Sequence, residues 1–375
     1  MLTASQFDTF VNPMMDLFSD YETSVIEDIA RRLKNLNFSS AAWQMQRLSE
    51  SGSLYKDVLK QLAKLTGKSE KVLEETFKRA GVKAITYDDK IYKAAGLEPP
   101  PLNLSPAMLK ALEAGLTKTN GVITNLTMTT AINAQQTFIK SANLAYMQVS
   151  TGAMSYDQAI RAAVKKMAAE GLSVVDYASG HEDKIDVAMR RTVLTGVAQT
   201  TNQLQINRAD EMGNDLVAVS AHAGARNVGT GPKNHASWQG KIYSRGGKNK
   251  KYPNFEEVTG YGTGEGLGGW NCRHSFYPYF EGLSENAYTK QEVRDLNKEK
   301  VTYQDKQVDL FTATQYQRAI ERKIRYWKRQ AAAMDAAKLD SNTEYQKIKY
   351  WQAQMRDFIN QTGLDRQSVR EQVIQ

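Results

Sequence analysis

The sequence predicts an α+β protein in which predominantly α-helical N-terminal and C-terminal regions flank a small glycine-rich α+β module. Two observations predict this fold class. Apolar residues recur at steps of three and four over most of the 375 residues, as they do along one face of a helix. Residues 222–280 interrupt that pattern with many glycines, each of which would cost a helix interior about 1 kcal/mol relative to alanine.

The composition is that of a folded protein, and its cysteine content fits a reducing compartment or a particle assembled inside a cell. Hydrophobic residues make up 41% of the chain, which is enough for cores in two or three domains. A single cysteine excludes an internal disulfide framework. The N-terminus shows no secretory signal, and no apolar run approaches the roughly 20 residues of a membrane-spanning helix, so we expect no membrane segment. The formal charge of +8 is compatible with work near nucleic acid or an acidic protein surface.

The first region, residues 1–98, is predicted to be helical. Apolar steps indicate a helix from Ala4 to about Leu36, which Pro13 should break or kink. Turns at Ser51–Gly52 and near Gly67 are expected to divide the rest into shorter helices: 41–48, 53–65 and 69–79.

Residues 61–79 also allow a helix-turn-helix interpretation, with Ser69 to Arg79 as the DNA-recognition helix. That helix carries three acids and three bases, a net charge of zero, whereas contact with phosphates needs positive charge. A plain helical hairpin is the favoured interpretation.

The second region, residues 102–180, follows a boundary at Pro99–Pro101. Ser105 is expected to cap a new helix and Pro106 to occupy its first position. Segments 106–149 and 156–170 are polar helices with a thin apolar stripe. Such helices bury little area at about 25 cal/mol per Å², so they should depend on one another or on a partner for stability.

The third region, residues 181–283, is the glycine-rich module. We expect it to open with a helix from His181 to Met212, with His181 as a cap, followed by strands at 216–219 and 241–243. From Trp270 onward the side chains would alternate along a strand, which places Cys272 and His274 on one face.

Four side chains of the module are candidate metal ligands, namely His222, His235, Cys272 and His274. Cys272 and His274 on one strand face, with the other two histidines as remote donors, would form a tetrahedral structural zinc site. Two alternatives remain open. One is a buried thiol beside a hydrogen-bonded histidine, and the other is the centre of a zinc- or thiol-dependent enzyme.

No other cofactor is expected. Gly264–Gly269 fits the pattern G-x-G-x-x-G, but it lacks the preceding buried strand and the following helix that a dinucleotide site requires.

The fourth region, residues 284–375, is predicted to be helical and basic. A charged connecting helix at 284–300 leads to apolar residues in heptad steps between 314 and 361. Ser341–Glu344 has the form of a capping box, which predicts that the chain bends there into a helical hairpin.

Basic residues gather in the loop between His222 and Tyr252 and in the first half of the last helical region. Such clusters can contact DNA or the acidic face of a partner, and an ordinary solvated surface is the alternative. The candidates for this contact are Arg226, Lys241, Arg245, Lys248, Lys250, Lys251, Arg322, Lys323, Arg325, Lys328 and Arg329.

Two stretches of the module resemble a known family. Residues 231–243 read GPKNHASWQGKIY and residues 268–274 read GGWNCRH. Four features of these stretches resemble the phage Mu F-like head-morphogenesis proteins. They are the proline, the histidine, the step through a glycine into a strand, and the final Asn-Cys-Arg-His sequence. The resemblance is greatest to the phage minor capsid protein 2 group.

This resemblance implies a non-enzymatic, structural minor capsid protein of a tailed bacteriophage. Such a protein would be assembled in the host cytoplasm and would end in the virion, in the capsid interior or at the portal vertex. Its expected partners are the portal and other capsid proteins, together with packaged DNA. Its expected role is to assist head morphogenesis and DNA packaging or delivery.

Overall fold

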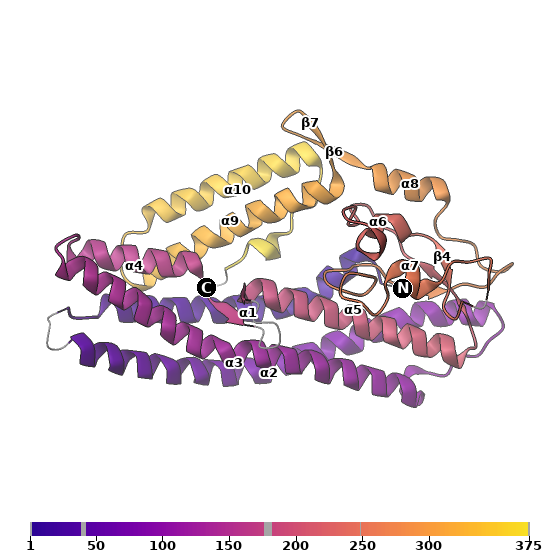
Figure 1. The fold of residues 1–375 in the computed structure, drawn as a ribbon, viewed down its shortest axis with the longest axis horizontal. Coiled ribbons are helices and arrows are strands. Elements are labelled where there is room, and N and C mark those ends of the chain that lie inside the picture. Colours follow the sequence, from indigo (N-terminus) through magenta and orange to yellow (C-terminus); the bar gives the residue numbers. More distant parts are fainter. Residues whose placement is uncertain (1, 39–42, 176–181, 248, 374–375) are drawn as a thin grey trace. The chain divides into compact units, whose positions relative to one another are not determined.

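The computed structural model describes residues 2–38, 43–175, 182–247 and 249–373. These residues form long helices and three small antiparallel sheets, which confirms the predicted α+β class (Figure 1). No helix in this part of the chain is long and apolar enough to cross a membrane.

In chain order the helices are α1 (Ala4–Lys34), α2 (Trp43–Ala94), α3 (Pro106–Ser150), α4 (Tyr156–Glu170), α5 (Ile185–Glu211), α6 (His235–Trp238), α7 (Phe255–Thr259), α8 (Lys290–Lys298), α9 (Leu310–Ala336) and α10 (Asn342–Thr362). The strands are β1 (Ser173–Val175), β2 (Glu182–Lys184), β3 (Leu216–Val219), β4 (Ile242–Ser244), β5 (Phe276–Pro278), β6 (Lys300–Tyr303) and β7 (Lys306–Asp309).

The chain forms two compact units, each built from three separate stretches. Unit 1 comprises Met1–Pro13, Glu70–Gly121 and Arg190–Gln315, and unit 2 comprises Met14–Ser69, Val122–Met189 and Tyr316–Gln375. The units group residues by proximity, whereas the four predicted regions follow the order of the sequence. The four regions therefore stay a prediction.

The segment after residue 42 is one helix of 52 residues, α2, instead of three shorter ones. It passes through Gly52 and Gly67 without a turn, so the predicted breaks, the favoured helical hairpin at 61–79 and the helix-turn-helix alternative are all wrong. Two glycines cost about 1 kcal/mol each. Apolar side chains buried along the helix outweigh that cost: Leu54, Val58, Leu62, Leu65, Leu73 and Phe77. In the same way α1 continues through Pro13, where a break or kink was predicted.

The start of α3 is as predicted. Pro106 is its first residue, and the Ser105 hydroxyl accepts a hydrogen bond of 3.3 Å from the backbone N–H of Met108. The predicted helix at 156–170 is α4, which begins with a capping box between Ser155 and Gln158. Local capping chemistry therefore sets both helix starts.

Helices α3 and α5 approach closely in unit 1 because each has a glycine at the contact. A Cβ atom on Gly115 would lie 2.8 Å from Thr200 Cγ2, and one on Gly196 would lie 2.9 Å from Thr119 Cγ2. Since 115 meets 200 and 119 meets 196, the two helices run antiparallel. Both threonines are buried in this contact.

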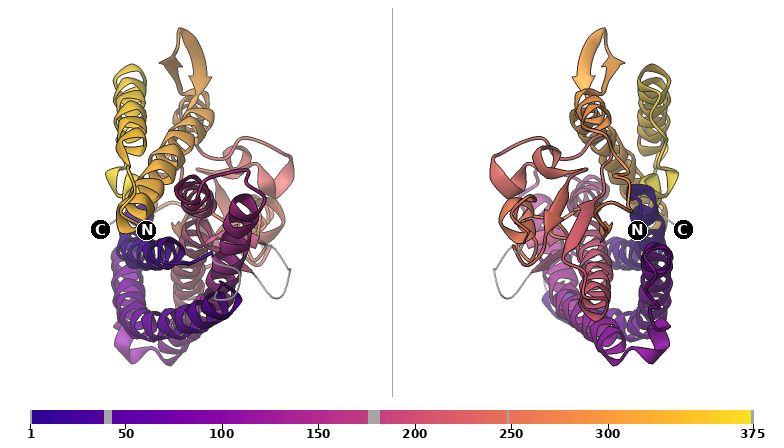
Figure 2. Two further views of the ribbon diagram at one scale, coloured as in Figure 1. Left: turned by 90° about the vertical axis from the view of Figure 1, so that its left-hand side faces the viewer. Right: turned by 90° about the vertical axis from the view of Figure 1, so that its right-hand side faces the viewer.

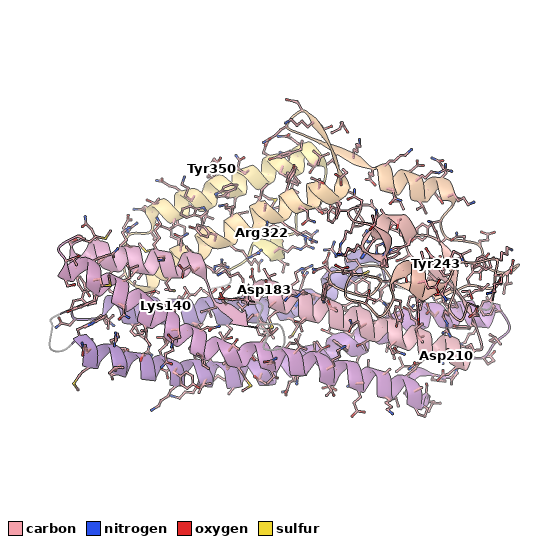
Figure 3. The ribbon with its side chains drawn as sticks, in the orientation of Figure 1. Lys140, Asp183, Asp210, Tyr243, Arg322 and Tyr350 are labelled. Carbon is pink, nitrogen blue, oxygen red and sulfur yellow. The ribbon has the colours of Figure 1, made fainter. Side chains whose placement is uncertain are left out.

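The module of unit 1 is a three-stranded sheet in the order β4-β3-β5, with both pairs antiparallel. Val217 at its centre pairs with Tyr243 on one side and Pro278 on the other. Tyr243 is fully buried among the loops of the module (Figure 3). Ile206 of α5 packs against the same core. The buried core residues are Val217, Val219, Trp238, Tyr243, Phe255, Leu267, Cys272 and Phe276.

Two predicted element starts within the module are wrong. The strand expected from Trp270 begins only at Phe276, because Asn271 has a φ of 56°, which no strand accommodates. Trp270 itself is 54% exposed, so it does not share a buried face with Cys272. The helix expected from His181 starts at Ile185, after the unpredicted strand β2. His181 lies outside the described residues.

The last region contains a strand pair that was not predicted. Helix α8 spans only part of 284–300, and β6 and β7 form a narrow antiparallel hairpin after it (Figure 2). The predicted hairpin of α9 and α10 is present. The capping box at its bend does not form. The Glu344 carboxylate is instead buried and forms an ion pair of 2.8 Å with Lys165 in unit 2.

The contact between α3 and α5 gives the first testable prediction. Gly115→Ala should lower the free energy of unfolding by about 1–3 kcal/mol, since the added methyl group forces Thr200 or the helix backbone to move. Urea denaturation measures the change. Gly121→Ala on the same helix is the matched control. Its methyl group would enter open space, and its higher helix propensity should leave stability equal or improved. Equal losses in the two variants would contradict the close contact.

Candidate functional site

The structure brings three of the four predicted ligands together in unit 1. The ligand atoms of His235, Cys272 and His274 all lie within 4.8 Å of one another, and the three residues are buried. His222 is not a member of this group of three. Its ring stacks on that of His274, with the centroids 4.4 Å apart. We refer to these four residues as the His/Cys cluster.

Short loops of the module position the cluster. His222 follows β3, His235 is the first residue of α6, and Cys272 and His274 lie in the turn before β5. The turn is fixed by its own backbone, since the N–H of Cys272 donates to the carbonyl of Gly269 at 3.1 Å. A side chain on Gly269 would collide with the carbonyl of Gly264. The glycines of the G-x-G-x-x-G stretch therefore serve a tight backbone turn.

Each histidine ring of the cluster hydrogen-bonds to an oxygen. His222 Nδ1 lies 2.9 Å from the carbonyl of Ala223, and His235 Nε2 lies 2.9 Å from the carbonyl of Glu265. His274 Nε2 lies 2.9 Å from the side-chain oxygen of Gln239. These bonds hold the rings in fixed orientations around the cysteine.

Gln239 is a residue of the site that the sequence analysis missed. Its side chain is fully buried, and its oxygen also accepts a 3.0 Å hydrogen bond from the backbone N–H of His222. Its amide nitrogen donates to the Asn297 side chain at 2.7 Å. Its place between Trp238 and Gly240 in the motif was visible in the sequence, but its burial was not.

Burial dominates the electrostatics of the cluster. It lowers the pKa of His235 to about 4 and the pKa values of His222 and His274 below their usual range. It also raises the pKa of the Cys272 thiol. The histidine rings are thus neutral at physiological pH. The thiol lacks the lowered pKa that a nucleophilic cysteine uses.

The candidate basic residues of the module fall into two groups. Arg226 and Arg245 are half-buried, and each donates to a backbone carbonyl at 3.0 Å, Arg226 to Trp270 and Arg245 to Ile206. Lys241, Lys250 and Lys251 are exposed, and Lys251 forms an ion pair with Glu281. The two arginines thus hold loops in place. Lys248 lies outside the described residues.

The basic residues of α9 divide in the same way. Arg325 forms a 3.0 Å ion pair with Asp186, and the buried Arg329 lies 3.5 Å from Glu22, both within unit 2. Lys328 is half-buried, and that burial lowers its pKa. Arg322 and Lys323 are exposed, and Figure 3 marks Arg322 on α9. Contact with DNA or a partner stays a prediction for the exposed residues.

Comparison with known proteins extends the similarity beyond the module. The sequence profile of the family described as Phage minor capsid protein 2 matches residues 2–360. The chain belongs to the phage minor capsid protein 2 family. The resemblance seen in residues 231–274 is therefore confirmed, and this minor capsid protein is a phage structural protein.

Two relatives of this minor capsid protein carry the name "Structural protein". That of Lactococcus phage LL-H is 25% identical over 370 residues, which cover 92% of this chain and 93% of the relative. That of Lactococcus phage mv4 is 30% identical over 131 residues, which cover 33% of this chain and 94% of the relative. No solved structure matches the chain.

The role of Gln239 gives a second prediction. Gln239→Leu should lower the free energy of unfolding by about 1–3 kcal/mol for each buried polar group that it leaves without a partner, chiefly the His222 N–H and the His274 ring. Chemical denaturation at neutral pH measures the loss.

Gln291→Leu is the control for that prediction. Gln291 is exposed on α8, and among the described residues its side chain bonds to Asp295 of the same helix, so the change should stay within about 0.5 kcal/mol. A Gln239→Leu protein as stable as this control would show that the buried amide does not hold the cluster.

Proposed function

We propose that this minor capsid protein lies in the capsid interior or at the portal vertex, where it assists head morphogenesis and DNA packaging or delivery. The observation that carries the proposal is the family match over residues 2–360, which includes the helical regions as well as the module. The LL-H relative, matched over nearly its whole length, is named as a structural protein.

Exposed apolar side chains on the long helices support a function through protein contacts. Met128 and Ile132, one turn apart on α3 in unit 2, are 64% and 47% exposed. Met45 and Leu48 near the start of α2 are 76% and 61% exposed. Exposed apolar side chains that adjoin one another on a helix can form part of a surface that binds a partner. The portal and other capsid proteins are the partners that we propose.

The exposed bases are where we place contact with DNA. Lys241 and Lys250 belong to the module, and Arg322 and Lys323 belong to α9. These four side chains are exposed, so phosphates can reach them. Lys241 also donates to the carbonyl of Ser237 at 2.6 Å.

An enzyme built on the His/Cys cluster receives less support. Cys272 and His274 are each only 1% exposed, so a substrate has no direct approach to them. The thiol is also protonated, because burial raises its pKa.

The proposal predicts the place of the chain in finished particles. Purified virions, cross-linked and analysed by mass spectrometry, should contain this chain joined to the portal protein more often than to the major capsid protein. Deletion of its gene should give heads with less packaged DNA, measured as genome copies per particle. Complementation with the intact gene is the control. Absence of the chain from virions would contradict the proposal.

A further prediction concerns the exposed bases. Charge reversal of Lys241, Lys250, Arg322 and Lys323 to glutamate should weaken binding to duplex DNA. The slope of log affinity against log salt should fall by about 0.9 for each phosphate contact that is lost. Lys349→Glu, an exposed position on α10 outside both clusters, is the control. An unchanged affinity and slope would show that these residues do not contact DNA.

A further inference from the structure

The donor atoms of three residues of the His/Cys cluster, His235, Cys272 and His274, are spaced like ligands of one metal ion. Cys272 Sγ lies 3.7 Å from His274 Nδ1. In a tetrahedral zinc site, with bonds of about 2.3 Å to sulfur and about 2.0 Å to nitrogen, these atoms are about 3.6 Å apart. The rings of His235 and His274 have centroids 5.4 Å apart and are inclined by 70°. Two imidazoles on one such ion have centroids about 5 Å apart.

The hydrogen bonds leave a lone pair on each ring. The carbonyls of Ala223 and Glu265 can only accept, so the ring nitrogens facing them carry the proton. The Gln239 oxygen accepts from a backbone N–H and must therefore accept from His274 as well. The lone pairs thus lie on His222 Nε2, His235 Nδ1 and His274 Nδ1. Metal-binding histidines show the same pattern, with the second nitrogen donating to a protein oxygen.

His222 carries a further sign that a ligand belongs here. Its Nε2 is buried, and within the described part of the chain it has no hydrogen-bond partner. A buried acceptor without a donor is costly and therefore rare in folded proteins. The ring stacks on that of His274, with the centroids 4.4 Å apart, so His222 borders the group of three donors. A cation at the cluster would provide the missing partner.

The surroundings of Cys272 also suit a metal-bound thiolate. The backbone N–H of His274 donates to the sulfur at 3.4 Å, and such a bond stabilises the negative form. A buried thiol stays protonated without a nearby positive charge, but a bound divalent ion deprotonates it outright. A hydrogen-bonded core of thiol and imidazole would explain Cys272 and His274. It leaves the lone pair of His222 unexplained.

We propose that His235, Cys272 and His274 bind one Zn²⁺ ion and that His222 supplies the fourth ligand. Mixed sulfur and imidazole donors in a tetrahedral arrangement select zinc among common divalent ions. The ion joins the loop after β3, the start of α6 and the turn before β5, which are distant in sequence. It acts as a structural crosslink of a module whose sheet has only three short strands.

Metal content is the first test. The full chain, purified in reducing buffer without chelator, should contain one zinc per chain by elemental analysis. Removal of zinc with a chelator should lower the Tm, and added ZnCl₂ should restore it, because an ion that binds only the folded state stabilises that state. A folded chain without zinc, whose Tm does not respond to added ZnCl₂, would overturn the proposal.

Cobalt substitution is the second test and needs no variant. Co²⁺ bound by a thiolate shows a sulfur-to-metal charge-transfer band, and tetrahedral coordination gives strong visible absorption. The chain has a single cysteine, so this band reports Cys272 alone. Both features are expected at one Co²⁺ per chain. Cobalt bound without the charge-transfer band would place the metal elsewhere and overturn the assignment.

Variants then test each ligand. Cys272→Ser should lose both the stoichiometric zinc and the charge-transfer band. His222→Gln should keep the band but bind zinc about tenfold or more weakly, as competition with a chromogenic chelator measures. His181→Gln is the matched control. It changes the one histidine of the chain that is not a proposed ligand, and it should bind zinc as the parent does. Equal zinc affinity in His222→Gln and the parent would remove His222 from the site.

Discussion

Helix α5 carries polar side chains that are buried in unit 1, and each of them needs a partner. Gln205 donates to the Asp88 carboxylate at 2.9 Å and to the carbonyl of Phe276 in β5. The fully buried Arg208 forms a 2.9 Å ion pair with Asp89 and donates to the carbonyl of Pro100 at 2.6 Å. These bonds tie the end of α2, the proline stretch and the central sheet to one helix. Removal of one partner would leave a buried polar group unsatisfied, so the polar contacts specify which elements meet.

Local signals were enough to predict several elements. The serine and proline at the start of α3 and the apolar run of β3 lie in short stretches of sequence, and the structure confirms both elements. The bend between α9 and α10 is also present, although the capping box that predicted it does not form. The continuity of α2 could not be predicted in this way. Gly52 and Gly67 predict turns when the sequence is considered locally. Only the burial of apolar side chains along the helix, which depends on the folded structure, outweighs their cost. The Ser341 capping box failed for a related reason, because Glu344 is engaged by Lys165 from another helix.

The candidate site was predicted by residue type more than by geometry. Cys272 and His274 were expected to share a strand face, and they do meet, but through a turn that contains the left-handed Asn271. Gln239, which holds two of the histidines, could not be recognised, because a glutamine carries no signal of its own burial. The basic residues show the same limit. A count of charges cannot distinguish Arg329, buried against Glu22, from the exposed Arg322.

The position of the one sulfhydryl group has a consequence for a particle that leaves its host. Cys272 is only 1% exposed, and the chain has no second cysteine. Two copies therefore cannot be linked through sulfur unless the module opens first. Dissolved oxygen in the medium outside the cell meets no accessible thiolate on this protein. Contacts between folded copies of this chain are therefore held without disulfide bonds, before and after lysis alike.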